Sequence, residues 1–199
     1  MFKFLIVLLF SLQILTQANV SYSYDIPPPP VKGSAADRED FRILHIYQDR
    51  RTPEQCRAAD LQSHPSVDGM FGPNTGILTA SEVRMVASQS DQLIRKVFSI
   101  TDPFKDLYLR MRPYNEDSTL HPCILMPGGS RAYPSGHSAV GIVLADFLAK
   151  KFPAKRDRIL AQGKQVGINR LIGGVHHPSD VVAGQSLGRQ IVLEQFNEE

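Results

Sequence analysis

The chain has 199 residues, a length that suits one domain with a hydrophobic core of its own. Hydrophobic residues make up 42% of it and charged residues 21%, which is a globular composition and excludes a disordered chain. The formal net charge is only +2, so a nucleic-acid partner is not expected. Its two cysteines are too few for a zinc scaffold made of cysteine ligands.

The N-terminal segment has the pattern of an export signal. Lys3 precedes a strongly apolar run over residues 4–16, and small and polar residues follow that run. The run is shorter than the roughly 20 apolar residues of a membrane-spanning helix, and no later stretch reaches that length. We therefore predict a signal peptide over residues 1–23, cleaved between residues 18 and 23. The mature chain, without a membrane span, is expected in the periplasm or outside the cell. The alternative is an uncleaved N-terminal anchor.

Export changes the interpretation of Cys56 and Cys123, because an oxidising compartment favours disulfides. Two cysteines allow only one intrachain pairing, so we expect a Cys56–Cys123 disulfide. In the chain-entropy model, closing a loop of this length stabilises the fold by up to about 4 kcal/mol. The alternative is two separate buried thiols.

The remainder of the chain is expected to be helical. Residues 24–33 include four consecutive prolines, which favour an extended polyproline II lead-in rather than a domain. After it, apolar residues recur at helical spacing and strand-like alternation is scarce. Helices are predicted over residues 34–50, from the capping box at residues 79–82, from Asp102–Pro103 to Pro113, and over residues 135–152, 156–172 and 178–196, with a loop over residues 114–133. We therefore expect an all-α, single-domain helical bundle over residues 34–199.

The first candidate cluster for chemistry is a pair of cations, Lys105 and Arg112. They lie seven residues apart, which is almost two helical turns, so both are expected to project from one helix face. On its own, such a pair also fits two solvated surface charges.

The second cluster is the sequence Pro134-Ser135-Gly136-His137, which follows a loop and opens a helix. Free backbone N–H groups at a helix start form an anion site. Gly136 lets a ligand approach the backbone closely, and His137 lies in the first turn beside any bound anion. Ser135 either donates its hydroxyl to that anion or only caps the helix.

The third cluster comprises Arg170, His176 and Asp180. A glycine pair turns the chain between Arg170 and His176, so both can point into one site. Asp180 follows His176 by four residues, a spacing that permits a carboxylate–imidazole contact. Alternatively, Asp180 only complements the dipole of the helix that it opens. His177 is expected to project elsewhere and receives no chemical role.

Together these residues predict a phosphoryl-transfer site that needs no metal or cofactor. His176 would attack phosphorus as the nucleophile, and Asp180 would orient its ring. His137 would protonate the leaving alcohol and then activate water. The remaining groups would hold the phosphoryl oxygens: Lys105, Arg112, Ser135, the Gly136 N–H and Arg170.

The ordered set Lys105-x6-Arg112-Pro113, Pro134-Ser135-Gly136-His137 and Arg170-x5-His176-x3-Asp180 resembles the signature of the type 2 phosphatidic acid phosphatase and vanadium haloperoxidase superfamily. Within it, the stretch from Lys105 to Pro113 is similar to that of bacterial class A non-specific acid phosphatases. The resemblance implies an exported all-α enzyme that hydrolyses many phosphomonoesters at acidic pH without a metal. It also implies inhibition by vanadate and, as often in that group, a homodimer. The chain departs from the pattern at Asn169, where serine is usual, and at His177, where another aromatic is common.

Three other functions compete with this one. A phosphatase for lipid or isoprenoid phosphates usually spans the membrane several times, which this sequence does not predict. A vanadium-dependent haloperoxidase uses the same residues around vanadate but is usually much larger. A non-catalytic phosphate-binding protein would not need His137, His176 and Asp180 together.

Overall fold

The computed structural model describes residues 24–125 and 127–196, so the predicted signal peptide over residues 1–23 lies outside the described part. Helices account for most of this part, and it contains no β-strand beyond one isolated bridge between Met111 and Arg131. The predicted all-α fold is therefore confirmed. The elements are α1 (Ala35–Arg50), α2 (Pro53–Asp60), α3 (Val67–Phe71), η1 (Pro73–Thr75), α4 (Ala80–Tyr108), α5 (Pro113–Glu116), α6 (Gly136–Lys151), η2 (Pro153–Lys155), α7 (Arg156–Ile172) and α8 (Pro178–Phe196).

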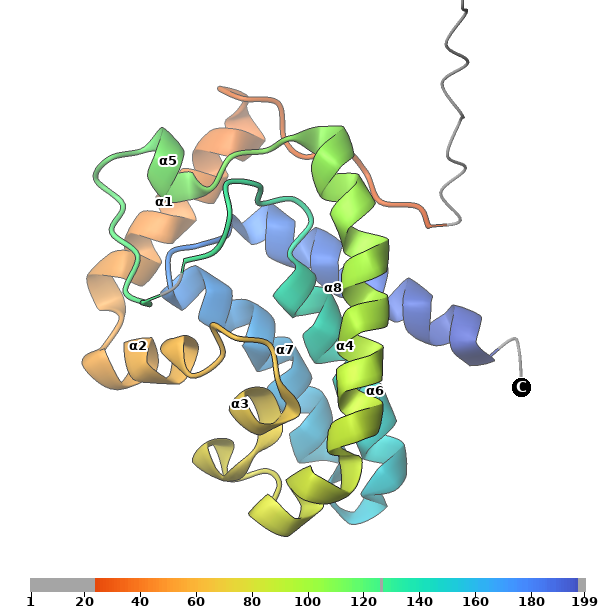
Figure 1. Ribbon diagram of the computed structural model, residues 1–199. Coiled ribbons are helices and arrows are strands. Elements are labelled where there is room, and N and C mark those ends of the chain that lie inside the picture. The colour runs from red at the N-terminus through yellow and green to blue at the C-terminus, as the bar shows by residue number, and fades with distance from the viewer. Residues whose placement is uncertain (1–23, 126, 197–199) are drawn as a thin grey trace, which may run out of the picture.

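Helix α6 forms the centre of the bundle, with α4, α7 and α8 packed around it (Figure 1). Its sequence is apolar on nearly every side, which is the composition of a helix that neighbours cover all round. The backbones of α6 and α7 approach closely at Gly141 and Gly163. A Cβ atom on Gly141 would lie 2.6 Å from the carbonyl oxygen of Gly163. The first half of α6 is thereby fixed against the middle of α7.

Four predicted helices match α1, α6, α7 and α8 to within one residue at either end. Helices α2 and α3 are not among the predicted elements, because eight and five residues are too few to show a helical period. The start of α2 nevertheless carries local signals: Thr52 and Gln55 form a capping box around Pro53.

The predicted helix start at Asp102–Pro103 is wrong. Helix α4 continues through Pro103 for 29 residues, although proline removes one backbone donor from the helix. The buried face of α4 runs across this point from Val97 through Thr101 to Phe104, so packing against the core outweighs the local penalty. The helix ends at Tyr108, because Leu109 adopts the left-handed conformation with a φ of 52°.

This end of α4 changes the placement of the two predicted cations. Lys105 lies on the last turn of α4, whereas Arg112 lies beyond it as the N-cap of α5. The expectation that both project from one helix face is therefore wrong. Pro113 opens α5 instead of ending a helix.

Two connections hold the periphery to the bundle. Cys56 on α2 and Cys123 in the loop after α5 form the predicted disulfide, with their Cα atoms 5.7 Å apart. The Pro-rich lead-in is extended and packs on the body, with Ile26 buried. Tyr108 donates a hydrogen bond to the carbonyl of Ile26, and Tyr133 donates one to the carbonyl of Pro27.

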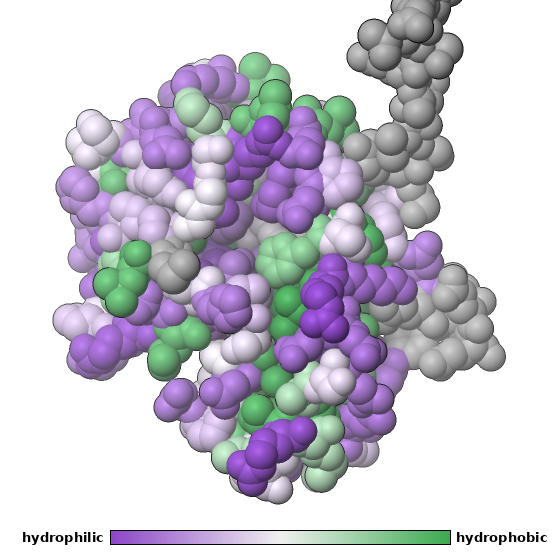
Figure 2. Space-filling model, viewed as in Figure 1, coloured by the Kyte–Doolittle hydropathy of each residue, from purple (hydrophilic) through white to green (hydrophobic). Residues whose placement is uncertain are grey.

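None of the helices in the described part is both long enough and apolar enough to cross a membrane. The face of the molecule in Figure 2 is mostly hydrophilic, with small hydrophobic areas scattered over it. The large apolar side chains are instead concentrated in the core, where Leu144, Leu148 and Leu187 are fully buried.

Candidate active site

All eight predicted site residues belong to one end of the bundle, where the start of α6, the end of α7 and the start of α8 meet. The peptide N–H of Ser135 donates to the carbonyl of Asp180 at 3.0 Å, which joins the start of α6 to α8. Lys105 donates to the carbonyl of Pro134 at 2.7 Å, and Arg112 contacts His176. Segments distant in sequence therefore converge on a single site.

The imidazole of His176 is held at both nitrogens and is almost wholly buried. Its Nε2 lies 2.6 Å from Nη1 of Arg112, and its Nδ1 lies 3.3 Å from Oδ2 of Asp180. A guanidinium group can only donate, so Nε2 must accept and therefore carries the lone pair. The proton of the neutral ring then sits on Nδ1 and points at the carboxylate. Burial and the charge of Arg112 hold the pKa of His176 well below its usual range.

The carboxylate of Asp180 is buried and receives donors on both oxygens. Besides His176, Oδ2 accepts from the backbone N–H of His177 at 2.8 Å and from its Nδ1 at 3.1 Å. Oδ1 accepts from Arg110 at 2.7 Å. Burial alone would raise the pKa of Asp180, but the hydrogen bonds from both histidines hold it well below its usual range. Asp180 is therefore ionised, and the expectation that His177 projects elsewhere is wrong.

The side chains of the three cations are oriented by backbone carbonyls. Lys105 binds the carbonyl of Pro134, the Nε of Arg112 donates to Gly129 at 2.9 Å, and Nη2 of Arg170 donates to Ala59 at 2.5 Å. A carbonyl dipole orients a cation without neutralising it, so the site keeps a positive excess. Burial and the charge of Arg112 accordingly lower the pKa of Lys105 to about 8. Burial, and to a smaller extent the positive charge of Arg112, lower the pKa of Arg170 to about 10.

Ser135 caps α6, which is one of the two roles predicted for it. Its Oγ accepts from the backbone N–H of Ser138 at 3.3 Å and from the Ser138 hydroxyl at 2.8 Å, which leaves its own proton to be donated. Gly136 has a packing reason to be glycine: a Cβ there would lie 2.6 Å from a ring carbon of Phe98.

His137 is half-buried in the first turn of α6, with its ring edge-to-face against Phe98 at 6.1 Å between centroids. Its Nε2 lies 3.3 Å from the carbonyl oxygen of Ser63, which accepts from that nitrogen. Burial, and to a smaller extent the positive charge of Arg170, lower the pKa of His137 to about 3. Arg112 and Lys105 act in the same direction, so the ring is neutral when no anion offsets these cations.

The model of the PAP2 superfamily matches residues 93–195, about half of the chain, and this range includes every predicted site residue. The chain belongs to the PAP2 superfamily. The superfamily named by the motifs is therefore confirmed, and so is an enzyme of the acid phosphatase type.

Curated relatives of this PAP2 chain include phosphatases. A non-specific acid phosphatase of Salmonella typhimurium is 29% identical over 183 residues, covering 86% of this chain and 72% of the relative. An acid phosphatase of Zymomonas mobilis is 40% identical over 167 residues, covering 80% of this chain and 63% of the relative.

A transmembrane PAP2 type phosphatidylglycerolphosphate phosphatase from Bacillus subtilis has a similar crystal structure, with a TM-score of 0.59. The two chains are 22% identical, and the match covers 84% of this chain and 89% of that one. This likeness shows a shared fold.

The motifs of the PAP2 chain did not include three buried charged residues. Arg110 donates to Asp180 and also to Asp40 at 2.9 Å and Asp37 at 3.3 Å. Two signals in the sequence were available. Arg110 lies inside the stretch between Lys105 and Pro113, and Asp37 and Asp40 lie three residues apart on the helix turns that carry the apolar residues of α1.

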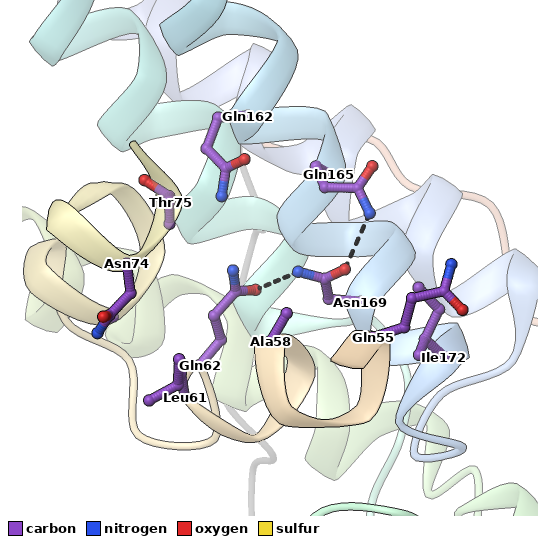
Figure 3. Close-up of a pocket in the computed structure, with 11 residues that line it drawn as sticks. Gln55, Ala58, Leu61, Gln62, Asn74, Thr75, Gln162, Gln165, Asn169 and Ile172 are labelled. Atoms are coloured by element: carbon purple, nitrogen blue, oxygen red, sulfur yellow. Dashed lines mark hydrogen bonds between the residues drawn. The ribbon is translucent and has the colours of Figure 1, made fainter. Parts of the chain in front are cut away.

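Asn169, which stands where serine is usual in the family, connects α7 to the turn that follows α2. Its amide N–H donates to Gln62 at 3.1 Å, and its carbonyl oxygen accepts from Gln165 at 2.9 Å (Figure 3). These side chains line part of a pocket of about 190 Å³ between α2, α3 and α7, which none of the predicted catalytic residues lines. The preceding helix, α2, supplies the Ala59 carbonyl that accepts from Arg170, so Asn169 and Arg170 both bind the segment that runs from α2 into this turn.

Proposed function

We propose that this PAP2 chain is an exported, non-specific acid phosphatase that hydrolyses phosphomonoesters through a phosphohistidine, without a metal. The observation that carries the proposal is which ring nitrogen of His176 holds the proton. Its Nε2 lone pair is directed toward Arg112, while Asp180 holds the proton on the opposite nitrogen. A nucleophilic nitrogen beside buried cations fits attack on an anionic phosphoryl group. The name of the Salmonella typhimurium relative supports the non-specific class, and the disulfide is consistent with export.

The phosphoryl group would be bound by the cations and by the start of α6. Lys105, Arg112 and Arg170 supply positive charge, and the Gly136 N–H and Ser135 hydroxyl supply neutral donors. The Nε of Arg170 is buried and has no hydrogen-bond partner in the described part of the chain, so an oxygen of the substrate would satisfy it. Burial strengthens each of these contacts, because the effective dielectric is low. The same donors would stabilise charge on the oxygens in the transition state.

In the first step, Nε2 of His176 forms a bond to phosphorus while the bond from phosphorus to the ester oxygen breaks. Protonated His137 gives its proton to that oxygen, and the alcohol leaves. The His176 ring now carries a positive charge, which the ionised Asp180 stabilises through the Nδ1 proton.

In the second step, a water oxygen attacks phosphorus and the bond from phosphorus to Nε2 breaks. His137 takes the proton that the water loses and is thereby ready for the next cycle. Inorganic phosphate leaves and His176 returns to its neutral form. The sum of both steps is phosphomonoester plus water to alcohol plus phosphate.

Binding of phosphate is expected to raise the pKa of His137 from its value of about 3 in the free site. The value is low partly because of Arg170, Arg112 and Lys105, and a bound anion offsets these charges. Substrate binding would thereby produce the protonated acid that the first step needs. Titration of the His137 ring by NMR, with and without phosphate, measures the shift. A pKa that phosphate leaves unchanged would contradict the proposed role.

The proposed function is tested by p-nitrophenyl phosphate hydrolysis at pH 5 to 6 with the purified mature protein and excess chelator. We expect turnover that persists in chelator and is lost with vanadate. Loss of turnover in chelator would contradict the metal-independent reaction. Binding of phosphate without any turnover would indicate a non-catalytic phosphate-binding protein.

A lipid phosphatase is the second candidate, because the similar crystal structure is that of a phosphatidylglycerolphosphate phosphatase. Micellar phosphatidate or isoprenoid phosphate, assayed beside soluble phosphomonoesters, separates the two. A much higher kcat/KM for the micellar substrates would favour the lipid enzyme. Peroxidase activity with halide after vanadate loading would instead indicate a haloperoxidase.

A further inference from the structure

The carboxylate of Asp180 is the middle of a longer chain of buried charges. Its Oδ2 faces Nδ1 of His176, and its Oδ1 accepts from Nη1 of Arg110 at 2.7 Å. The other terminal nitrogen of Arg110 donates to Asp40 at 2.9 Å and to Asp37 at 3.3 Å. The Arg110 side chain is only 7% exposed. A continuous path of hydrogen bonds therefore leads from α1, through Arg110, to the ring of His176.

We propose that Arg110 is a positioning residue for phosphoryl transfer: anchored to Asp40, it fixes the carboxylate of Asp180 in the orientation that holds His176 ready for attack. The inference rests on the proposed role of His176 as the nucleophile. It assigns to Arg110 a function through Asp180 and no contact with the substrate.

Competition at Oδ2 of Asp180 makes such a restraint necessary. This oxygen accepts from the backbone N–H of His177 at 2.8 Å and from the His177 ring at 3.1 Å, whereas His176 is the most distant donor at 3.3 Å. The terminal torsion of an aspartate is soft. Without a partner on Oδ1, the carboxylate is free to turn toward the nearer donors, and the contact with His176 is the first to be lost.

The shape of the guanidinium group suits this task better than a point charge does. Nη1 of Arg110 donates to Asp180 at 2.7 Å and to the Ser179 hydroxyl at 2.6 Å. Nη2 donates to the carboxylates of α1. The Ser179 hydroxyl in turn donates to Asp40, which closes a ring of contacts. A lysine at this position keeps the charge but has one nitrogen, so it cannot reproduce the planar fork.

The test compares Arg110→Lys and Arg110→Gln with the wild type in p-nitrophenyl phosphate hydrolysis, measured as kcat, KM and the pH profile of kcat/KM. For Arg110→Lys we expect kcat to fall by about 10- to 100-fold, because the nucleophile is displaced. KM should change by less than about threefold, since the phosphate-binding cations are untouched.

Arg110→Gln also removes a positive charge near His176. The charged groups that face the His176 ring are Arg112, Lys105 and Asp180, and the charge of Asp180 would no longer be balanced by Arg110. Protonation of His176 then becomes easier, and the acid limb of kcat/KM should move to higher pH. In Arg110→Lys this limb should stay in place, so the two variants separate orientation from charge.

Arg51→Gln is the matched control. Arg51 is also an anchored arginine, which donates to the carbonyls of Ile172 and His121, but it does not contact Asp180. We expect a lower melting temperature with kcat and the acid limb unchanged.

A folded Arg110→Lys protein with kcat within twofold of the wild type would overturn the inference, and this variant decides if Arg110→Gln fails to fold. Absence of turnover in the wild type would overturn the proposed function, and with it this inference. An active wild type beside an equally active Arg110→Lys would overturn the inference alone.

Discussion

Replacing His176 with alanine is expected to reduce kcat by about 10⁴-fold or more, because the variant has no nitrogen that can form the bond to phosphorus. The cations that bind the phosphoryl group remain in place. Phosphate and vanadate should therefore still bind, with an affinity near that of the wild type. The measurement is steady-state hydrolysis of p-nitrophenyl phosphate, together with vanadate binding by calorimetry.

The matched control is His121→Ala, which removes an imidazole from an exposed position outside the site. It should leave kcat and KM unchanged. Trapping adds a second measurement: acid-labile phosphate should be found on the wild type after rapid quenching and be absent from His176→Ala. A near-normal rate for His176→Ala would exclude the phosphohistidine mechanism.

Replacing His137 with alanine is expected to discriminate between substrates by their leaving groups. An alkoxide needs a proton as the ester bond breaks, whereas p-nitrophenolate is stable without one. Loss of a general acid costs about 10²- to 10⁴-fold, so kcat/KM for an alkyl phosphate should fall within that range. The kcat/KM for p-nitrophenyl phosphate should fall much less, because p-nitrophenolate can leave without a proton and kcat/KM does not include the second step.

The second step supplies an independent measurement on the same variant. Without His137 to accept a proton from water, breakdown of the phosphohistidine is slow, and p-nitrophenol should appear in a burst close to one equivalent. Equal losses of kcat/KM for alkyl and aryl substrates would argue against an acid role for His137. The edge-to-face contact with Phe98 would then point to a packing role for the ring.

Buried cations have different roles on the two sides of the His176 ring. Toward the substrate, Lys105, Arg112 and Arg170 donate to backbone carbonyls, and Arg112 also donates to the neutral ring of His176, so these contacts leave their positive charge in place. On the opposite side of the ring, Arg110 is surrounded by carboxylates. Burial alone would lower the pKa of Arg110, but the charges of Asp180 and Asp40 outweigh burial and raise that pKa. One set of cations therefore remains available to an anion, while the other cation is committed to holding Asp180.

Much of the candidate site was predictable, because its signals are local. The helix start at Ser135-Gly136-His137, the glycine pair before His176 and the four-residue spacing to Asp180 each concern neighbours in the chain. The structure adds the direction of each side chain. The spacing of Lys105 and Arg112 predicted a shared helix face, but the left-handed Leu109 ends the helix between them.

The sequence by itself determined the all-α fold, four of the long helices and the eight candidate site residues, because periodicity, caps and motif spacing act over a few residues. Only the tertiary structure decided how α4 continues through Pro103, where His177 points, and which partner fixes Asp180. The physical reason is distance along the chain. Arg110 meets Asp40 across 70 residues, and Arg112 meets His176 across 64, and no local pattern carries information on such a contact. These contacts form only when the buried faces of α1, α4 and α8 have packed together.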